Sequence, residues 1–511
     1  MSMKMDRDHA MTADRRDVVP ETQRPQRWPA PGSAVGNEWT RTWHAEPMRW
    51  LRLAGARLAR WSRTGEGRSL LILLGVALLI RLPLLPYHGF FHDPQTYLDW
   101  GINLDRDPLH FYTNTLSANY TPLTPYLDGL MWLIYQAAAH LLGQPAIADT
   151  YHSALLATIF KIPDLVAELA LTAVTYHVVR PVVTHRWALA AAAIYALSPA
   201  ILFVGVLYGQ TDATYTVFVV LAVVATYRRQ SIRAGAYFAL AFMLKPTPIF
   251  LLPLLAVALW RYAGWRGVAR FGGAFAVVSG TLWMPFLLPP HFEVLRWVAN
   301  VQFDNKSQAS YNAANFWWAV GARGRSSLTP IYAGLTPSQI GWAVFAAVLL
   351  AAALAAWKSA SFGVLLFTSA IVALTFFEIT PDQHERFVYL APVLFLLAAA
   401  YHHRRASLAL CLCFSGIMLL NTVFNLALQY PISIDDLDLS YWHGFLMYTH
   451  PKYLRLFAAG STALWLGSLA ILAGDLAIAY SPRATMTLLA WLRAKFDAMA
   501  RPSAAPVKSR R

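Results

Sequence analysis

The chain has 511 residues, of which 57% are hydrophobic and 14% are charged. Apolar runs of about 20 residues recur along most of it and exclude an ordinary soluble protein, since runs of that length cross the hydrocarbon of a bilayer. The net charge of +15 does not require a nucleic-acid partner, because the basic residues gather at the termini and in short loops, where anionic lipid headgroups and the orientation of the spans account for them.

The two ends of the chain are polar and basic. Residues 1–47 are rich in Arg and Pro, which predicts a disordered cytoplasmic arm without a cleavable signal peptide. Residues 48–68 carry arginines on one helical face and Trp and Leu on the other, which predicts an amphipathic helix on the cytoplasmic surface; a disordered basic arm is the alternative. Residues 482–511 are expected to form a basic cytoplasmic tail, so that both termini lie inside.

A transmembrane domain is predicted over residues 69–481. Its first span, Ser69 to Tyr87, follows an Arg-rich segment, so the positive-inside rule places the long loop after this span outside. A second span is expected from Pro122 to Leu142. The later apolar stretches are 151–179, 188–207, 213–227, 234–260, 271–289, 338–357, 361–379, 387–401, 407–428 and 454–480.

Two of these stretches are interrupted by a lysine and proline, at KIPD (161–164) and at KPTP (245–248). Each interruption either kinks one helix or separates two short helices. Paired helices are favoured, because only then do all the basic loops share one side. The basic loops are 180–186, 228–233, 261–270 and 402–405. The predicted fold is an all-α polytopic membrane protein of about 12 to 14 transmembrane helices, with both lysines near the outer surface.

In this topology the acidic residues of chemical interest lie on the outer side. Asp93 follows His92 in FHDPQTYLDW, directly after the first span. A carboxylate at the edge of the low-dielectric region can accept a proton from an attacking hydroxyl, so Asp93 is a candidate general base. A helix N-cap followed by proline is the alternative interpretation, and it does not conflict with function.

Further polar residues stand where later helices begin or end. Gln210 and Asp212 lie in LYGQTDATY between two apolar segments. Their side chains form directional hydrogen bonds of the kind that hold sugar hydroxyls, although a simple turn also explains them. Tyr120 precedes spaced prolines that give the second span a rigid start.

The two interrupting lysines have different neighbours. Lys161 is three residues from Asp164, so a structural ion pair is as plausible as a binding site. Lys245 has no acidic neighbour in sequence, and an unpaired lysine at membrane depth is costly unless it reaches the interface or an anion such as a lipid phosphate.

The segment PDQHERF, residues 381–387, brings His384, Glu385 and Arg386 to the start of an apolar helix. Backbone N–H groups at a helix start attract anions, and the guanidinium of Arg386 suits a phosphate. An interfacial salt-bridge cluster with Glu385 is the alternative. Cys411 and Cys413 share one apolar run and predict neither a disulfide nor a metal site.

The order of these segments resembles that of the GT-C glycosyltransferases. The segments are HDPQTYLDW, YTPLTPYL, KIPDL, SPAILFVGVLYGQTD, AGAYFALAFMLKP, NAANFWWAVG and HERFVYLAP. From about residue 69 to 400 the chain resembles bacterial proteins related to the second GPI mannosyltransferase, and it is also similar to dolichyl-phosphate-glucose-dependent glucosyltransferases. One departure is Thr121, which stands where that family usually has the first of two adjacent prolines.

The resemblance implies an inverting enzyme that transfers a single hexose, mannose or glucose, from a polyprenyl-phosphate carrier on the outer face. It implies that Asp93 is the general base and that Lys245 and Arg386 contact the carrier phosphate. Trp317 belongs to an aromatic loop able to stack on a sugar. The complete set of candidate substrate-binding residues is His92, Tyr120, Lys161, Asp164, Gln210, Asp212, Lys245, Asn315, Trp317, His384, Glu385 and Arg386.

The expected partners are the lipid-linked sugar, membrane lipids, and a lipid, glycan or protein acceptor, in a bacterial plasma membrane. No cofactor is implied, although some relatives use a divalent metal. A transporter or lipid flippase and a polysaccharide polymerase are the alternatives. The sequence shows no convincing inverted repeat of the transporter kind, and its outer loop 290–337 is modest and aromatic rather than long and Arg-rich.

Overall fold

A computed structural model describes residues 61–89, 92–115, 117–149, 153–287, 308–429 and 440–481. Within these ranges the side chains of His92, 426–429 and 440–453 are not described. The predicted arm, the predicted tail and most of the predicted amphipathic segment, up to residue 60, lie outside the described residues.

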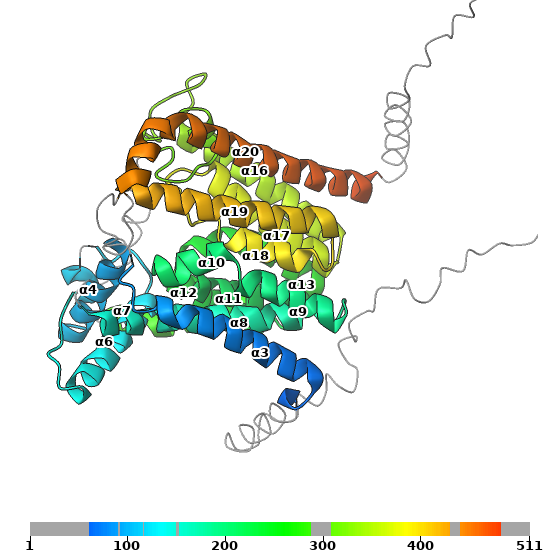
Figure 1. The fold of residues 1–511 in the computed structure, drawn as a ribbon. Helices are drawn as coiled ribbons and strands as arrows, with labels where there is room; N and C mark the ends of the chain where they lie inside the picture. The colour runs from blue at the N-terminus through cyan, green and yellow to red at the C-terminus, as the bar shows by residue number, and fades with distance from the viewer. Residues whose placement is uncertain are drawn as a thin grey trace, which may run out of the picture. The chain divides into compact units, whose positions relative to one another are not determined.

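The described residues form helices and contain no strand beyond two isolated bridges, Gln308 with Ser326 and Tyr332 with Leu335. The predicted all-α class is therefore confirmed (Figure 1). In chain order the helices are α3 (Gly65–Arg81), η2 (Leu82–Leu84), α4 (His92–Arg106), α5 (Phe111–Asn114), α6 (Leu123–Leu141), α7 (Ala154–Phe160), α8 (Ile162–Val179), α9 (His185–Ala196), α10 (Pro199–Leu202), η3 (Phe203–Leu207), α11 (Asp212–Tyr227), α12 (Ser231–Leu244), η4 (Thr247–Leu251), α13 (Leu252–Leu287), α15 (Phe316–Ala319), α16 (Pro337–Lys358), α17 (Phe362–Ile379), α18 (Leu390–Ala398), α19 (Arg404–Gln429) and α20 (Ser440–Tyr480).

Eight of the described helical segments are long and apolar enough to cross a membrane, which confirms a polytopic membrane protein. This is fewer than the predicted 12 to 14 helices, partly because α11 and α12 have only 16 and 14 residues. At ~1.5 Å per residue such helices span roughly 21–24 Å, less than the ~30 Å hydrocarbon core. The eight are Gly65–Leu84, Ile162–Val179, His185–Leu207, Thr247–Leu287, Pro337–Lys358, Phe362–Ile379, Arg404–Asn425 and Leu454–Tyr480.

The predicted second span forms a helix, α6, that is not among these eight. Asp128, Gln136 and His140 interrupt its apolar run and lower its hydropathy. The helix packs against α4 and α7, and the three lie together at one end of the bundle (Figure 1). The chain therefore leaves α3, builds this small helical group, and returns through α8.

The two interrupted stretches divide where the sequence predicts. Lys161 separates α7 from α8, and Lys245 ends α12 before η4 and α13 begin. Because α7 has only seven residues, the first interruption separates a short helix from a span rather than one span from another.

The long helix α13 changes direction at Gly264, where φ is +69° and ψ is −177°. Only glycine adopts this backbone conformation readily, so the chain can reverse there within the basic loop 261–270. Tyr262 packs against Tyr227 at the end of α11, whereas the Tyr126 hydroxyl of α6 donates to the Leu282 carbonyl. The first half of α13 therefore runs towards the end of α11, and the second half runs back towards α6.

The basic loops meet at one end of the bundle, called here the basic end. The rings pack in the order Tyr262, Tyr227, Phe362 and Tyr401. They join the turn inside α13, the turn before α12, the start of α17 and the turn after α18. The Tyr401 hydroxyl also bonds the carbonyl of Val178 near the end of α8. The predicted gathering of the basic loops on one side is thus present in the structure.

The other end is called here the site end. Helix α17 runs towards it from the basic end, and α18 runs back. Nearly every residue of these two helices is buried, since their apolar side chains face neighbours on all sides. The segment 380–389 connects them at the site end, and it carries His384, Glu385 and Arg386.

Candidate functional site

Asp93 lies in the first turn of α4, with its side chain 30% exposed. Its Oδ2 atom accepts a hydrogen bond of 2.6 Å from the Gln210 amide and lies 3.1 Å from Nη2 of Arg386. These three side chains come from segments more than 100 residues apart, α4, the turn before α11 and the turn before α18. The carboxylate is therefore held in one orientation by two donors and remains accessible on another side.

Arg386 is the hub of the cluster, and its side chain is only 7% exposed. Its Nη1 atom donates at 3.0 Å to the Tyr208 hydroxyl and at 3.0 Å to Oε1 of Glu385. The Tyr208 hydroxyl in turn donates to the same Glu385 oxygen at 3.1 Å. The guanidinium thus joins Asp93 to a second carboxylate through one planar fork of donors.

Lys245 forms the second cationic point of the site. Its Nζ lies 2.6 Å from Oδ1 of Asp212, and both side chains are almost fully buried. The ammonium also lies over three aromatic rings, with centroid distances of 5.6 Å to Tyr120, 5.4 Å to Tyr215 and 4.9 Å to Phe387. Carboxylate and ring faces together compensate a charge that would otherwise be costly at this depth.

The two cationic points meet at Asp212. Its Oδ2 atom lies 3.8 Å from Nε of Arg386, and among the described residues neither atom has a hydrogen-bond partner. Buried polar groups are nearly always satisfied in a folded protein. A donor and an acceptor facing each other just beyond bonding distance therefore mark a place where a polar group of a substrate can enter.

Electrostatics keep Asp93 ionised. Burial opposes ionisation of its carboxyl, but the charge of Arg386 and the hydrogen bond from Gln210 outweigh burial and lower the pKa of Asp93 below its ordinary value. Burial, reinforced by Arg386, lowers the pKa of His384 to about 4, so this imidazole is neutral at neutral pH. A neutral imidazole beside an ionised carboxylate can accept or donate a hydrogen bond without competing for the proton.

The segment that carries Arg386 is fastened to residues 308–315. Asp382 has φ of +58°, and its backbone N–H and its carboxylate both bond the backbone of Gln308, at 3.0 and 2.8 Å. The carbonyl of Gln383 accepts from Asn312 and Ala313. This pairing fixes the conformation from which Arg386 projects.

Asn315 and Trp317 lie next to this pairing rather than among the charged groups. The Asn315 amide donates to the Phe377 carbonyl at 2.9 Å, and the Trp317 indole donates to the Ile379 carbonyl at 2.7 Å. Both side chains are at most 1% exposed, and both bonds end on the last turn of α17. By contrast, Tyr311 is 44% exposed and its ring packs 4.9 Å from that of His384.

Lys161 and Asp164 do not form the ion pair that their spacing suggested. The Lys161 ammonium bonds the carbonyls of Tyr87 and Val206, the latter at 2.6 Å. Asp164 Oδ1 instead accepts from the Ala213 N–H in the first turn of α11 at 3.1 Å. Each side chain fastens backbone that flanks the Gln210–Asp212 turn, and burial lowers the pKa of Lys161 to about 7.

Several contributors were not singled out from the sequence. Tyr208 bridges Glu385 and Arg386, and the Tyr97 hydroxyl lies 3.4 Å from the Gln210 amide oxygen. In the sequence, each of these tyrosines is marked only by its place next to a polar motif. Aromatic residues are common at membrane interfaces, so this pattern is weak evidence for a site. The hydroxyls of Thr121 and Thr124 donate to the carbonyls of Phe242 and Leu244, which fixes the end of α12 just before Lys245.

The site thus brings together Asp93, Gln210, Asp212, Lys245, Glu385 and Arg386, with His384 and Tyr120 at its edge. His92 begins α4, but its side chain lies outside the described set. The arrangement offers an ionised carboxylate, two cations and, beside His384, the exposed ring of Tyr311.

Comparison with known families shows a match over part of the chain. The model of glycosyltransferase family 87 matches residues 152–381, a region that includes Gln210, Asp212 and Lys245 and excludes Asp93 and Arg386. No curated protein matches the sequence. Over this region the chain is similar to glycosyltransferase family 87, and the match indicates glycosyltransferase activity in an all-helical membrane protein.

Proposed function

We propose that the protein is an inverting glycosyltransferase that moves one hexose from a polyprenyl-phosphate carrier to a lipid, glycan or protein acceptor. The observation that carries this proposal is the contact of Asp93 with Arg386, in a cluster that also contains Lys245. A base next to cations is what displacement at a sugar phosphate needs.

In the proposed reaction the acceptor hydroxyl donates its proton to Asp93 while its oxygen attacks the anomeric carbon. The bond from that carbon to the phosphate oxygen breaks, and the carrier phosphate leaves with the electron pair. One in-line displacement inverts the anomeric configuration. The protein has to position the hydroxyl and stabilise the leaving phosphate, and no further co-reactant is needed.

Arg386 and Lys245 are proposed to bind the carrier phosphate, although both are paired with carboxylates in the structure. A phosphate that takes a share of the Arg386 donors draws the guanidinium away from Asp93. Since the positive charge lowers the pKa of Asp93, this exchange makes the carboxylate a stronger base. Donor binding and activation of the base are thereby coupled.

The sugar is proposed to lie against Gln210, His384 and the exposed ring of Tyr311. Gln210 and His384 supply directional hydrogen bonds, and an aromatic face suits the apolar side of a pyranose. By the positive-inside rule the basic end faces the cytoplasm, so the site end is proposed to be extracytoplasmic.

Asp93→Asn tests the proposal, because the amide keeps the shape and cannot accept the proton. Purified protein in detergent is incubated with radiolabelled polyprenyl-phosphate mannose or glucose and a membrane-lipid extract as acceptor. We expect transfer to fall by about 10² to 10⁴. The matched control is Asp99→Asn, which changes an exposed carboxylate on the same helix that accepts a hydrogen bond from Gln95. Wild-type transfer by Asp93→Asn would exclude the base role.

A lipid flippase or other transporter is favoured by one observation, the buried pair of Arg81 in α3 with Glu168 in α8. Charged residues within spans are commonly functional. Transfer of label in detergent, where there is no sealed compartment, would support the enzyme. Movement of lipid in sealed vesicles without any transfer would support the transporter.

A further inference from the structure

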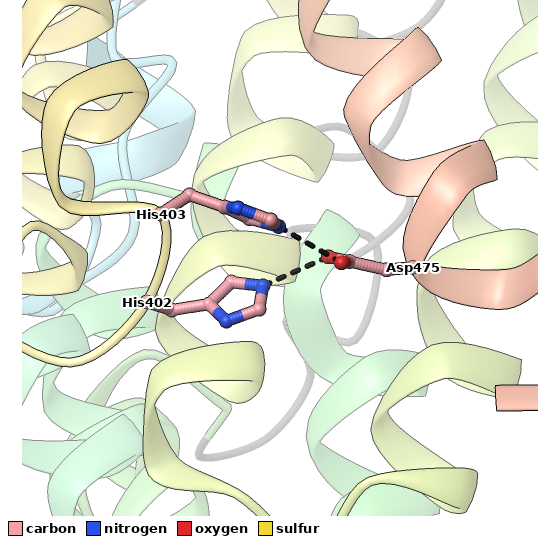
Figure 2. Close-up of side chains that lie close together, drawn as sticks. All are labelled: His402, His403 and Asp475. Carbon is pink, nitrogen blue, oxygen red and sulfur yellow. Dashed lines mark hydrogen bonds and ion pairs between the residues drawn. The ribbon is translucent and has the colours of Figure 1, made fainter. Parts of the chain in front are cut away.

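Three metal-ligating side chains meet at the basic end, away from the Asp93 site. The Nε2 atoms of His402 and His403 each lie 2.8 Å from one carboxylate oxygen of Asp475. Figure 2 shows both imidazole rings turned towards this carboxylate, from the turn between α18 and α19 on one side and from α20 on the other. Within the described ranges no other group of three His, Cys, Asp or Glu side chains has the spacing to hold a metal ion.

The donor set selects the kind of ion. Imidazole nitrogens suit zinc and its neighbours among the transition metals, whereas magnesium and calcium prefer sites made of oxygen. We propose that His402, His403 and Asp475 bind a divalent transition-metal ion of the Zn²⁺ class.

The three ligand atoms lie within 4.8 Å of one another. A tetrahedral ion about 2.0 Å from each ligand would set the ligand atoms roughly 3.3 Å apart. A contact of 2.8 Å between a histidine nitrogen and a carboxylate oxygen therefore has to open by about 0.5 Å, and a separation near the 4.8 Å limit has to close. Phe367 packs against both rings, at centroid distances of 5.4 and 5.5 Å, and limits their other movements.

The backbone presents both histidines to one point. Neighbouring residues of a regular helix do not face the same way. Here His403 has φ of +44°, which is uncommon outside glycine and is kept only where the surrounding structure maintains it. The side chains remain partly exposed, 20% for His402, 36% for His403 and 16% for Asp475, so an ion can reach them from solvent.

Hydrogen bonds alone are the competing explanation, because two imidazole N–H groups can share one carboxylate. The two explanations differ in what a glutamine at either histidine position does. A glutamine amide can still donate to Asp475, but it is a poor ligand for zinc. An ion would also join α20 to the turn before α19, and its effect would be on this contact rather than on sugar transfer.

Cobalt binding tests the site directly. The protein is purified without a polyhistidine tag, stripped with EDTA and titrated with Co²⁺, whose visible d–d absorption reports nitrogen and oxygen ligation. We expect saturation at a single equivalent and displacement of Co²⁺ by Zn²⁺. In His402→Gln and His403→Gln the dissociation constant should rise by more than about 100-fold, beyond the usual effect of outer-shell changes.

The matched control is His140→Gln, which changes an exposed histidine on α6 at the other end of the bundle. It should bind Co²⁺ as the wild type does. Asp475→Asn adds a third variant, and gel filtration of every variant shows whether it is folded. A wild type without saturable binding, or a loss as large in His140→Gln as in His403→Gln, would overturn the proposal.

Discussion

The site end and the basic end hold charged side chains in opposite ways. At the site end, Arg386, Lys245 and Asp212 are at most 7% exposed and contact one another or other charged groups. At the basic end, Arg180 is 39% exposed and pairs with Glu66, which is 40% exposed. Arg404 is also exposed and lies 5.3 Å over the ring of Trp187.

This contrast teaches that burial of the charged side chains, more than their number, distinguishes the proposed reaction site from the basic surface at the other end. Exposed arginines near headgroups gain little from any single partner, and water screens them. Charges withdrawn from water interact strongly, and each depends on its partner. Substitutions at the two ends should therefore differ in size, and the following predictions test that difference.

Among substitutions of the cationic side chains, the largest effect on transfer is expected for Arg386→Gln. Loss of one preorganised cation at a leaving phosphate typically costs about 10² to 10³ in rate. We expect transfer to fall by that factor and the KM for the lipid-linked donor to rise. The matched change at the basic end is Arg404→Gln, which should leave both constants within about twofold. An unchanged donor KM in Arg386→Gln would exclude phosphate binding by this residue.

Lys245→Met should destabilise the fold strongly, because it leaves Asp212 buried beside an apolar side chain. Breaking a buried ion pair from one side costs about 3–5 kcal/mol. Unfolding in detergent, followed by tryptophan fluorescence, measures the loss. The double variant Lys245→Met with Asp212→Asn removes both charges and should recover part of it. If the double variant is no more stable than the single one, the pair is not the source of the effect.

The pH dependence of transfer should change in Gln210→Leu. The proposed reaction needs the Asp93 carboxylate, so activity should be lost as pH falls through its pKa, which in the wild type lies below the ordinary 3.8. Removing the hydrogen bond from Gln210 raises that pKa while burial remains. The acid limb of kcat/KM should therefore move to higher pH. Superimposable profiles, or a shift to lower pH, would contradict the assignment of the base.

The smallest effect is expected for Arg180→Gln. The pair that it breaks is solvent-exposed on both sides, and such pairs contribute about 0–1 kcal/mol. The same unfolding measurement should show a change of at most this size. A loss comparable with that of Lys245→Met would remove the distinction between the two ends.

Local patterns in the sequence were sufficient for the fold class. Hydropathy identified an all-α membrane protein, and the lysine and proline in each of the segments 161–164 and 245–248 marked real helix boundaries, because both features act on the residues that carry them. The span expected at 122–142 differed, since α6 carries a buried Asp128 and packs against α4 and α7 in a small helical group.

The site was only partly accessible to such reasoning. Asp93, Gln210, Asp212, Lys245 and Arg386 were each named from their own motif, and the structure brings them together. Which of them pair could not be derived, because pairing depends on tertiary packing. Lys161 and Asp164 were close in sequence yet bond different backbones, whereas His403 and Asp475 are 72 residues apart and had no common motif.

The two threonine hydroxyls of the YTPLT segment have a mechanical consequence. They bond the last carbonyls of α12, and the chain continues directly from them into α6, which packs on α4. A tilt of the α4–α6 pair would carry the end of α12 with it. Asp93 and Lys245 would then move in the same direction, so their separation would change little while a substrate enters or leaves.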